Sequence, residues 1–226
     1  MIRVNKSFPR TAEAESLEVS ALRFLGEPAS ARVVGIDFLA NEDGHPALEK
    51  GQLLYGQVLK AVKEGRSRLH RTMHSGEIGD TRNPRDALIL GSERLGHGVL
   101  MSEDPVTLEF ASRRKVPVEV NLASNLRLTK VERIADHPFL DFLRLGLPIS
   151  LSTDDEGIFD TDIAHECELA VAETDITYAE LKQMAFNSID TSFASDSDKI
   201  GLRAGLTEKF TDFERKMAGD FHTPTR

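Results

Sequence analysis

Short apolar or β-branched runs alternate six times with segments of helical pattern, and this alternation most constrains the fold. We expect strands over Ile2 to Phe8, Arg32 to Leu39, His70 to His74, Glu93 to Gly98, Val116 to Leu122 and Leu147 to Thr153. Several of these runs are apolar without interruption, which is typical of strands covered on both faces. Strands that alternate with helices indicate a parallel α/β sheet.

Cap residues mark most of the intervening helices. Asn or Asp followed by Pro begins two of them, Gly146 ends another, and Thr177 with Glu180 has the spacing of a capping box. Helices are expected from Asn83, over Val106 to Arg113, Asp136 to Leu145, Thr177 to Phe186 and, as a long amphipathic helix, Ser197 to Met217.

The polar candidates for chemistry each follow a different expected strand. A (β/α)8 barrel builds its active site in this way, from the carboxyl ends of its strands. The 226 residues contain only six strand–helix units. We therefore expect residues 1–226 to form a single, partial domain: the last six units of a TIM-type barrel followed by C-terminal helices, with the first two units absent.

Composition excludes several classes of function. The net charge of −9 disfavours nucleic acid as a partner, and no apolar run is long enough to span a membrane. A single cysteine, Cys167, excludes an internal disulfide and is expected to be half-buried in a helix. No signal-peptide pattern follows Met1. A cytoplasmic location is the default expectation, and a secreted or periplasmic one requires a signal upstream; the oligomeric state stays open.

The segment His74-Ser75-Gly76-Glu77 places a metal-type ligand and a carboxylic acid three residues apart at a strand end. The imidazole of His74 could bind a metal, and Glu77 could act as a general acid or base over the same cavity. By itself the tetrapeptide is weak support for either role.

Two later strand ends carry complementary groups. His97 lies between Gly96 and Gly98, which permit close approach of a ligand; a base acting on metal-bound water and a structural histidine are both open. Asp154 and Asp155 repel each other unless one of them binds a cation, and a solvated turn is the alternative.

Other polar residues have weaker patterns. Asp37 in an apolar strand needs a partner, Glu42 could hold the following loop, and Ser124 and Asn125 could orient neighbours, with turn or cap roles equally open. The remaining histidines are expected to be structural or solvated: His45, His70, His137, His165 and His222.

Taken together, these motifs resemble the adenosine/AMP deaminase family of metal-dependent hydrolases. The matching segments, in the family's order, are Gly-x-Asp-x-x-x-x-Glu at 35–42, His-x-Gly-Glu at 74–77, Arg-x-Gly-His-Gly at 94–98, Glu-x-Asn-x-x-Ser-Asn at 119–125, His-Pro at 137–138, Ser-Thr-Asp-Asp at 152–155 and a later helix at 184–189. The continuation Glu42-Asp43-Gly44 is most similar to the secreted, growth-factor-like branch.

The resemblance implies zinc-dependent hydrolytic deamination of adenosine, or a related 6-aminopurine nucleoside, to inosine and ammonia. It implies that His74 and Asp154 ligate Zn²⁺, that Glu77 protonates purine N1, and that His97 holds or deprotonates the attacking water. It further implies that Asp155 hydrogen-bonds to N7 and that Ala40 and Gly76 contact the substrate. AMP is less favoured, because no Arg/Lys cluster lies beside the motifs.

Two departures from the family pattern matter. The family's first strand supplies two more zinc ligands from a His-x-His pair, and these 226 residues contain no His-x-His. His74 and Asp154 are therefore half of a tetrahedral ligand set. Ala40 stands where the family usually has Gly, which adds a methyl group near purine N3.

Three hypotheses follow from these patterns. The favoured one is an adenosine deaminase, present here without its first two barrel units. The second is a deaminase or hydrolase that acts on another aminopurine. The third is a non-catalytic, truncated homologue, motivated by the missing ligand pair. We expect these 226 residues alone neither to bind zinc tightly nor to deaminate adenosine.

Overall fold

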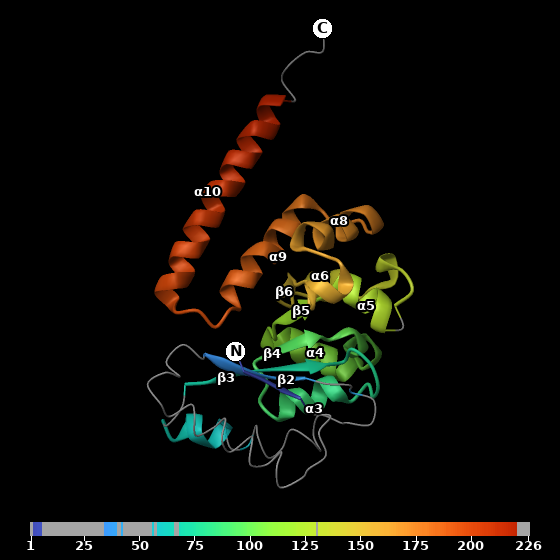
Figure 1. The fold of residues 1–226 in the computed structure, drawn as a ribbon, viewed down its shortest axis with the longest axis vertical. Coiled ribbons are helices and arrows are strands. Elements are labelled where there is room, and N and C mark those ends of the chain that lie inside the picture. Colours follow the sequence, from blue (N-terminus) through green and yellow to red (C-terminus); the bar gives the residue numbers. More distant parts are fainter. Residues whose placement is uncertain are drawn as a thin grey trace.

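The computed structural model describes residues 2–5, 34–39, 42, 56, 58–65, 68–129 and 131–220. Six parallel strands form one sheet in chain order (Figure 1). They are β1 (Ile2–Asn5), β2 (Gly35–Leu39), β3 (His70–Ser75), β4 (Arg94–His97), β5 (Val118–Val120) and β6 (Ile149–Leu151). Each expected strand is present, so the parallel α/β sheet is confirmed. β4, β5 and β6 are each shorter than expected by one or two residues at both ends.

Helices follow the strands and cover the sheet (Figure 1). Those whose bounds lie within the described residues are α3 (Asn83–Ile89), α4 (Pro105–Arg114), α5 (Leu122–Leu128), α6 (Phe139–Arg144), α7 (Glu156–Phe159), α8 (Ile163–Glu173), α9 (Tyr178–Asp190) and α10 (Asp196–Asp220), with 3-10 turns η2 (Val99–Glu103) and η3 (Ile134–Asp136). Two of the expected N-caps are present, but the one expected at Asn83 is not, because Arg82 occupies the N-cap position of α3 and no side chain caps that helix. Asp104 accepts hydrogen bonds from the backbone N–H groups of Val106 and Thr107, and Thr177 and Glu180 form a reciprocal capping box. The patterns did not delimit α5, α7 or α8, although Cys167 is half-buried in α8, as expected.

The expected helix over Asp136 to Leu145 is divided in two. A 3-10 turn ends at Asp136, and α6 begins only at Phe139, because the ring of Pro138 disfavours a helical conformation at His137, whose backbone is extended. Gly146 ends α6 with a φ of 84°, a conformation that glycine adopts without strain. The short segment between the two parts carries His137, which becomes important at the site below.

The core lies on both faces of the sheet. Buried apolar side chains from β2 to β6 pack with helix residues, chiefly Phe139, Phe142, Ala170 and Met184. Because both faces of the sheet are buried, the sequences of the strands are apolar with few interruptions. On β6, the side chain of Asn187 in α9 donates a hydrogen bond to the carbonyl of Ile149 at 2.9 Å.

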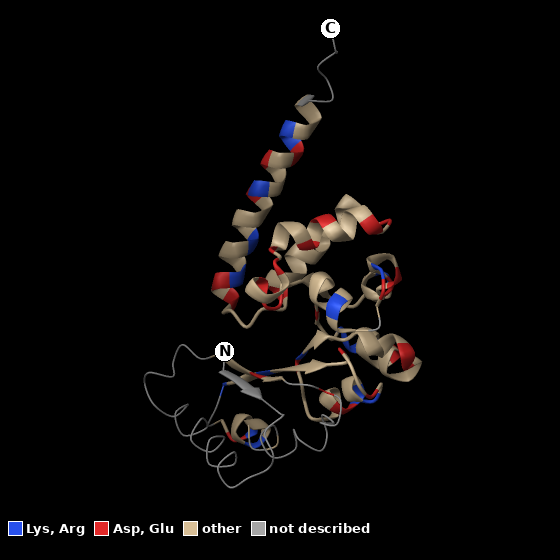
Figure 2. Cartoon of the chain, turned by 45° about the vertical axis from the view of Figure 1, so that its right-hand side comes forward, with Lys and Arg blue, Asp and Glu red and all other residues tan. Residues whose placement is uncertain are grey.

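Helix α10 extends away from the sheet (Figure 1), and Lys and Arg are interspersed with Asp and Glu along it (Figure 2). Glu214 of α10 accepts hydrogen bonds from Tyr178 and Lys182 of α9, and these contacts hold the two helices together. Most of the described side chains of α10, including Ile200 and Phe213, are exposed. None of the helices that the structure describes is long and apolar enough to cross a membrane.

Candidate active site

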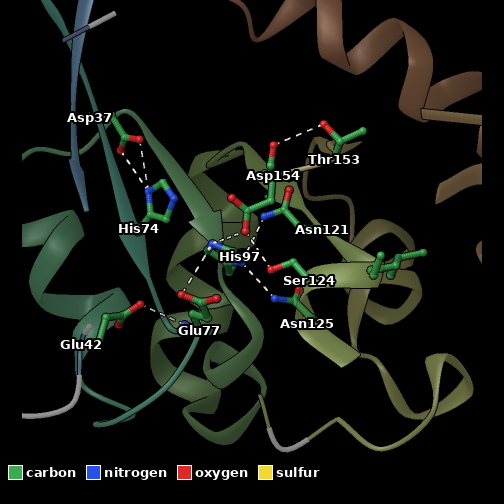
Figure 3. A network of polar contacts seen from close by, with 12 residues as sticks. Asp37, Glu42, His74, Glu77, His97, Asn121, Ser124, Asn125, Thr153 and Asp154 are labelled. Atoms are coloured by element: carbon green, nitrogen blue, oxygen red, sulfur yellow. Dashed lines mark hydrogen bonds and ion pairs between the residues drawn. The ribbon is translucent and has the colours of Figure 1, made fainter. Parts of the chain in front are cut away.

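Polar residues from successive strands converge at the carboxyl edge of the sheet (Figure 3). His74 lies near the end of β3, His97 is the last residue of β4, Asn121 directly follows β5, and Asp154 follows β6 by three residues. Parallel strands in chain order bring their carboxyl ends to one edge, so residues that are far apart in sequence meet there.

Glu77, His97 and Asp154 form the centre of this site. Nε2 of His97 lies 3.8 Å from Oε2 of Glu77 and 3.9 Å from Oδ2 of Asp154. One ligand-type atom from each residue lies within 4.8 Å of the others. The imidazole is buried, and only 13% and 12% of the two carboxylate side chains are exposed. Two carboxylates held this close together favour a cation, since it would offset their repulsion.

His74 is paired with Asp37 from the neighbouring strand. Nδ1 of His74 lies 3.2 Å from Oδ2 of Asp37, whose carboxylate is buried. Burial alone would lower the pKa of His74, but the hydrogen bond to Asp37 and the negative charges of Asp37, Asp154 and Glu77 together raise it. A metal-binding histidine usually presents its second ring nitrogen to such a carboxylate, so Nε2 is the nitrogen suited to a metal.

The backbone at this edge is strained at two functional side chains. His97 and Asp154 have φ values of 66° and 57°, a left-handed conformation that costs non-glycine residues free energy. Such strain persists where the surrounding structure over-determines it, and it concentrates at active sites. The two residues that the sequence favours for chemistry are therefore held against their local preference.

Glu42 fixes the turn that carries Glu77. Its buried carboxylate accepts hydrogen bonds from the backbone N–H groups of Gly76 and Glu77, at 2.8 and 3.1 Å, and from Nδ2 of Asn83 at 3.0 Å. Glu42 was expected to hold the loop that follows it. That loop lies outside the described residues; Glu42 holds the turn after the next strand, because neighbouring parallel strands end side by side.

Glu166 in α8 holds the first turn of α5, directly after β5, in the same manner. Its carboxylate accepts hydrogen bonds from the backbone N–H groups of Leu122 and Ala123, the shortest at 2.7 Å, and from the hydroxyl of Thr161. Burial raises the pKa of Glu166, while these hydrogen bonds lower it, and the net direction is upward. Sequence patterns did not identify Glu166, since a lone acid inside a helix gives no signal of its distant partners.

Asn121 and the first turn of α5 orient both central residues. The hydroxyl of Ser124 donates to Oδ2 of Asp154 at 2.8 Å, and the side-chain amides of Asn121 and Asn125 lie 3.1 and 2.9 Å from Nδ1 of His97 (Figure 3). The prediction that Ser124 and Asn125 orient neighbours is therefore confirmed.

The other predicted residues are placed less centrally. Asp155 is exposed beside Asp154, and Gly76 lies in the turn before Glu77. Ala40, His45 and His222 lie outside the described residues. His137 was expected to be structural or solvated, and it is structural. Its buried ring is hydrogen-bonded to Asn125, whose side chain in turn contacts His97.

The residues at this edge suit a divalent metal. Imidazole nitrogen and carboxylate oxygen are the donors that zinc takes in catalytic sites, which usually have three protein ligands. His74 and Asp154 supply two such donors, with Glu77 and His97 around them. The excess of negative charge and the carboxylate behind His74 both fit a bound cation.

A partial parallel β/α barrel whose strand ends bring imidazole and carboxylate groups together has the architecture of the TIM-barrel metal-dependent hydrolases. The sequence model of the adenosine deaminase family matches residues 3–209. Adenosine deaminases of Photorhabdus laumondii and Aliivibrio fischeri are 33% and 34% identical over 76% of this chain and 50% of their own length. The chain belongs to the adenosine deaminase family, and it spans about half the length of these curated relatives.

Solved structures agree with this assignment. An adenine deaminase from Arthrobacter aurescens superposes with a TM-score of 0.79 at 30% identity, covering 92% of this chain and 60% of that chain. An amidohydrolase from B. ambifaria, solved with bound zinc, superposes with a TM-score of 0.80 at 23% identity, covering 96% of this chain and 58% of that one. At that identity the second likeness shows the fold alone.

Proposed function

We propose that this chain carries the acid and part of the metal site of a zinc-dependent deaminase, which converts adenosine or a related 6-aminopurine nucleoside to inosine and ammonia. The observation that carries the proposal is the convergence of Glu77, His97 and Asp154 at one edge of the sheet, with His74 beside them. Family membership supports the same reaction class.

The residues divide the work of the reaction as follows. Glu77 donates a proton to purine N1, which makes C6 more electrophilic. His97 holds the water whose oxygen forms a bond to C6. Of the two protons of that water, one returns to the carboxylate of Glu77 and the other passes to the amino nitrogen, whose bond to C6 breaks as ammonia leaves. Asp155, exposed at the rim, hydrogen-bonds to N7.

His74 and Asp154 would hold the zinc ion, each through one donor atom. Zinc supplies a Lewis acid, which lowers the pKa of water to near neutrality. Asp37 keeps the ring of His74 oriented, and Ser124 keeps the carboxylate of Asp154 oriented. Because the 226 residues contain no His-x-His pair, we propose that the remaining ligands of a tetrahedral set come from outside them.

A second candidate is deamination of another aminopurine. The Arthrobacter structure, at 30% identity over most of this chain, is described as an adenine deaminase. Free adenine lacks the ribose, and nothing in the described site selects for a sugar. The reaction at C6 would be the same, so the difference would lie in substrate contacts alone.

The test is a substrate panel with the full-length protein and added zinc. We expect adenosine to be converted to inosine with release of ammonia, faster than adenine, AMP or N6-methyl-AMP. Faster conversion of another aminopurine would replace adenosine in the proposal. If the protein deaminates none of these substrates, the proposal is overturned and the hypothesis of a non-catalytic homologue is favoured.

A further inference from the structure

The protonation of His137 is fixed by a backbone group. The N–H of Phe139 donates a hydrogen bond to Nδ1 of His137 at 3.1 Å. A backbone N–H is always a donor, so Nδ1 must present a lone pair. Burial lowers the pKa of His137 to about 3, so the ring is neutral near pH 7. Its single proton therefore lies on Nε2.

That proton determines how the side-chain amide of Asn125 is turned. Nε2 of His137 lies 3.0 Å from Oδ1 of Asn125, and an N–H group requires an acceptor. The oxygen of the fully buried Asn125 amide therefore faces His137, and its NH₂ group faces the other way. Which way an asparagine amide is turned usually has to be inferred from its hydrogen-bond network. Here the network ends in a backbone N–H, which can only donate, so the orientation is determined.

The amide in turn determines which ring nitrogen of His97 carries the proton. Nδ2 of Asn125 lies 2.9 Å from Nδ1 of His97, and an amide NH₂ group can only donate. Nδ1 of His97 is therefore an acceptor, and neutral His97 carries its proton on Nε2. That nitrogen is the one that faces Glu77 and Asp154.

Asn121 also contacts Nδ1 of His97, at 3.1 Å, but it does not fix the tautomer. Its Oδ1 is buried and has no hydrogen-bond partner among the described residues. The Asn121 amide can therefore turn to suit either tautomer of His97. The amide of Asn125 cannot do so without breaking its hydrogen bond to His137.

We propose that His137 is a positioning residue that acts through Asn125 to hold His97 as the Nε2–H tautomer. His97 then donates a hydrogen bond into the site and holds the attacking oxygen, instead of accepting a proton from it. The tautomer follows from the described contacts alone, whereas the identity of the oxygen rests on the proposed function.

The test reads the tautomer directly, from ¹⁵N–¹H spectra of the histidine side chains in the full-length protein without zinc. Spectra are recorded near pH 8.5, about two units above the ordinary imidazole pKa. His97→Gln identifies the His97 signals. We expect an unprotonated Nδ1 and a protonated Nε2 in the wild type. Asn125→Asp puts an acceptor opposite Nδ1 and should move the proton to that nitrogen.

Two substitutions of His137 separate its hydrogen bond from its packing. His137→Gln retains an N–H donor for Asn125 and should keep the wild-type tautomer. His137→Phe retains a ring but no donor; it should give a mixture of tautomers and, in the zinc-loaded protein, a kcat lower by about 10–100-fold with little change in KM. His70→Phe, at the opposite end of β3, should leave the His97 spectrum unchanged.

The wild-type spectrum is decisive even if the variants fail to fold. A proton on Nδ1 of wild-type His97 would overturn the inference, as would a folded His137→Phe protein with the wild-type His97 spectrum. If the Nε2–H tautomer is found in a protein that deaminates no purine, the inference stands and the proposed function fails.

Discussion

The carboxylate of Asp37, in the middle of β2, lies 3.2 Å from Nδ1 of His74, near the end of β3. The two residues are 37 positions apart in the chain. Parallel pairing of β2 with β3 brings them together, and the contact fixes which nitrogen of His74 can reach a metal.

Asp37→Asn should weaken zinc binding. An amide at this position is a poorer acceptor for the N–H of His74, so the imidazole is less basic and less well oriented. We expect zinc affinity of the full-length protein to fall by about 10–100-fold, measured by competition with a chelating dye. Asp141→Asn, on the exposed side of α6, is the matched control and should bind zinc as the wild type does. Equal affinities in the two variants would remove Asp37 from the metal site.

Glu77→Gln should abolish most of the deaminase activity without unfolding the protein. The amide fills the same space but cannot deliver a proton to purine N1. General acid catalysis contributes about 10²–10⁴-fold, so kcat should fall within that range while zinc binding persists. A variant that retained more than a tenth of wild-type kcat would show that another group protonates the purine.

Glu166→Gln should loosen the first turn of α5. Glutamine has one oxygen to accept the hydrogen bonds now made by the backbone and by Thr161, and its NH₂ group would face a donor. We expect a loss of about 1–3 kcal/mol in the free energy of unfolding, measured by urea titration. Glu173→Gln, exposed at the end of the same helix, should change stability by less than about 0.5 kcal/mol. The proposed anchoring role is lost if the two variants are equally stable.

Gly76→Ala should strain the turn before Glu77. Gly76 has a φ of 82°, and a Cβ there would lie 2.7 Å from Cγ of Pro84. The backbone conformation alone should cost about 1–2 kcal/mol, and Glu77 should be displaced with its turn. Gly205→Ala, in open space on α10, is the control and should be neutral or slightly stabilising. An unchanged unfolding midpoint for Gly76→Ala would contradict the described turn.

His137 should make the fold less stable in mild acid. Its pKa of about 3 in the fold lies below the ordinary 6.5, so the unfolded chain binds the proton more readily. Stability is therefore fully present above pH 6.5 and is lost as the pH falls toward 3. Between pH 7.5 and pH 5, protonation linked to this residue should lower the free energy of unfolding by about 2 kcal/mol. Urea titrations at a series of pH values measure this change. His137→Gln should flatten that part of the profile, and a profile of unchanged slope would exclude His137 as its source.

The positions of the strands along the chain were predictable because each strand has a recognisable local sequence pattern. Runs such as Val33-Val34-Gly35-Ile36 and Pro148-Ile149-Ser150-Leu151 are short, apolar and bounded by polar turns, so position and order follow from the sequence. Once the sheet is parallel and in chain order, its strand ends must share an edge. His74, His97 and Asp154 could therefore be placed together without coordinates.

The contacts that orient these residues were not predictable, because they join distant positions through groups that every chain contains. Glu42 and Glu166 bind backbone N–H groups, which have no sequence signature. The sequence around His137 gives no sign of its contact with Asn125, which forms only in the folded protein.

The sequence by itself therefore determined which chemical groups the protein carries and at which strand ends they lie, since periodicity and turn chemistry are local properties. Only the tertiary structure decided how those groups are oriented and protonated. A hydrogen bond has a direction, and its direction at His97 depends on a chain of buried donors and acceptors that ends at the backbone N–H of Phe139.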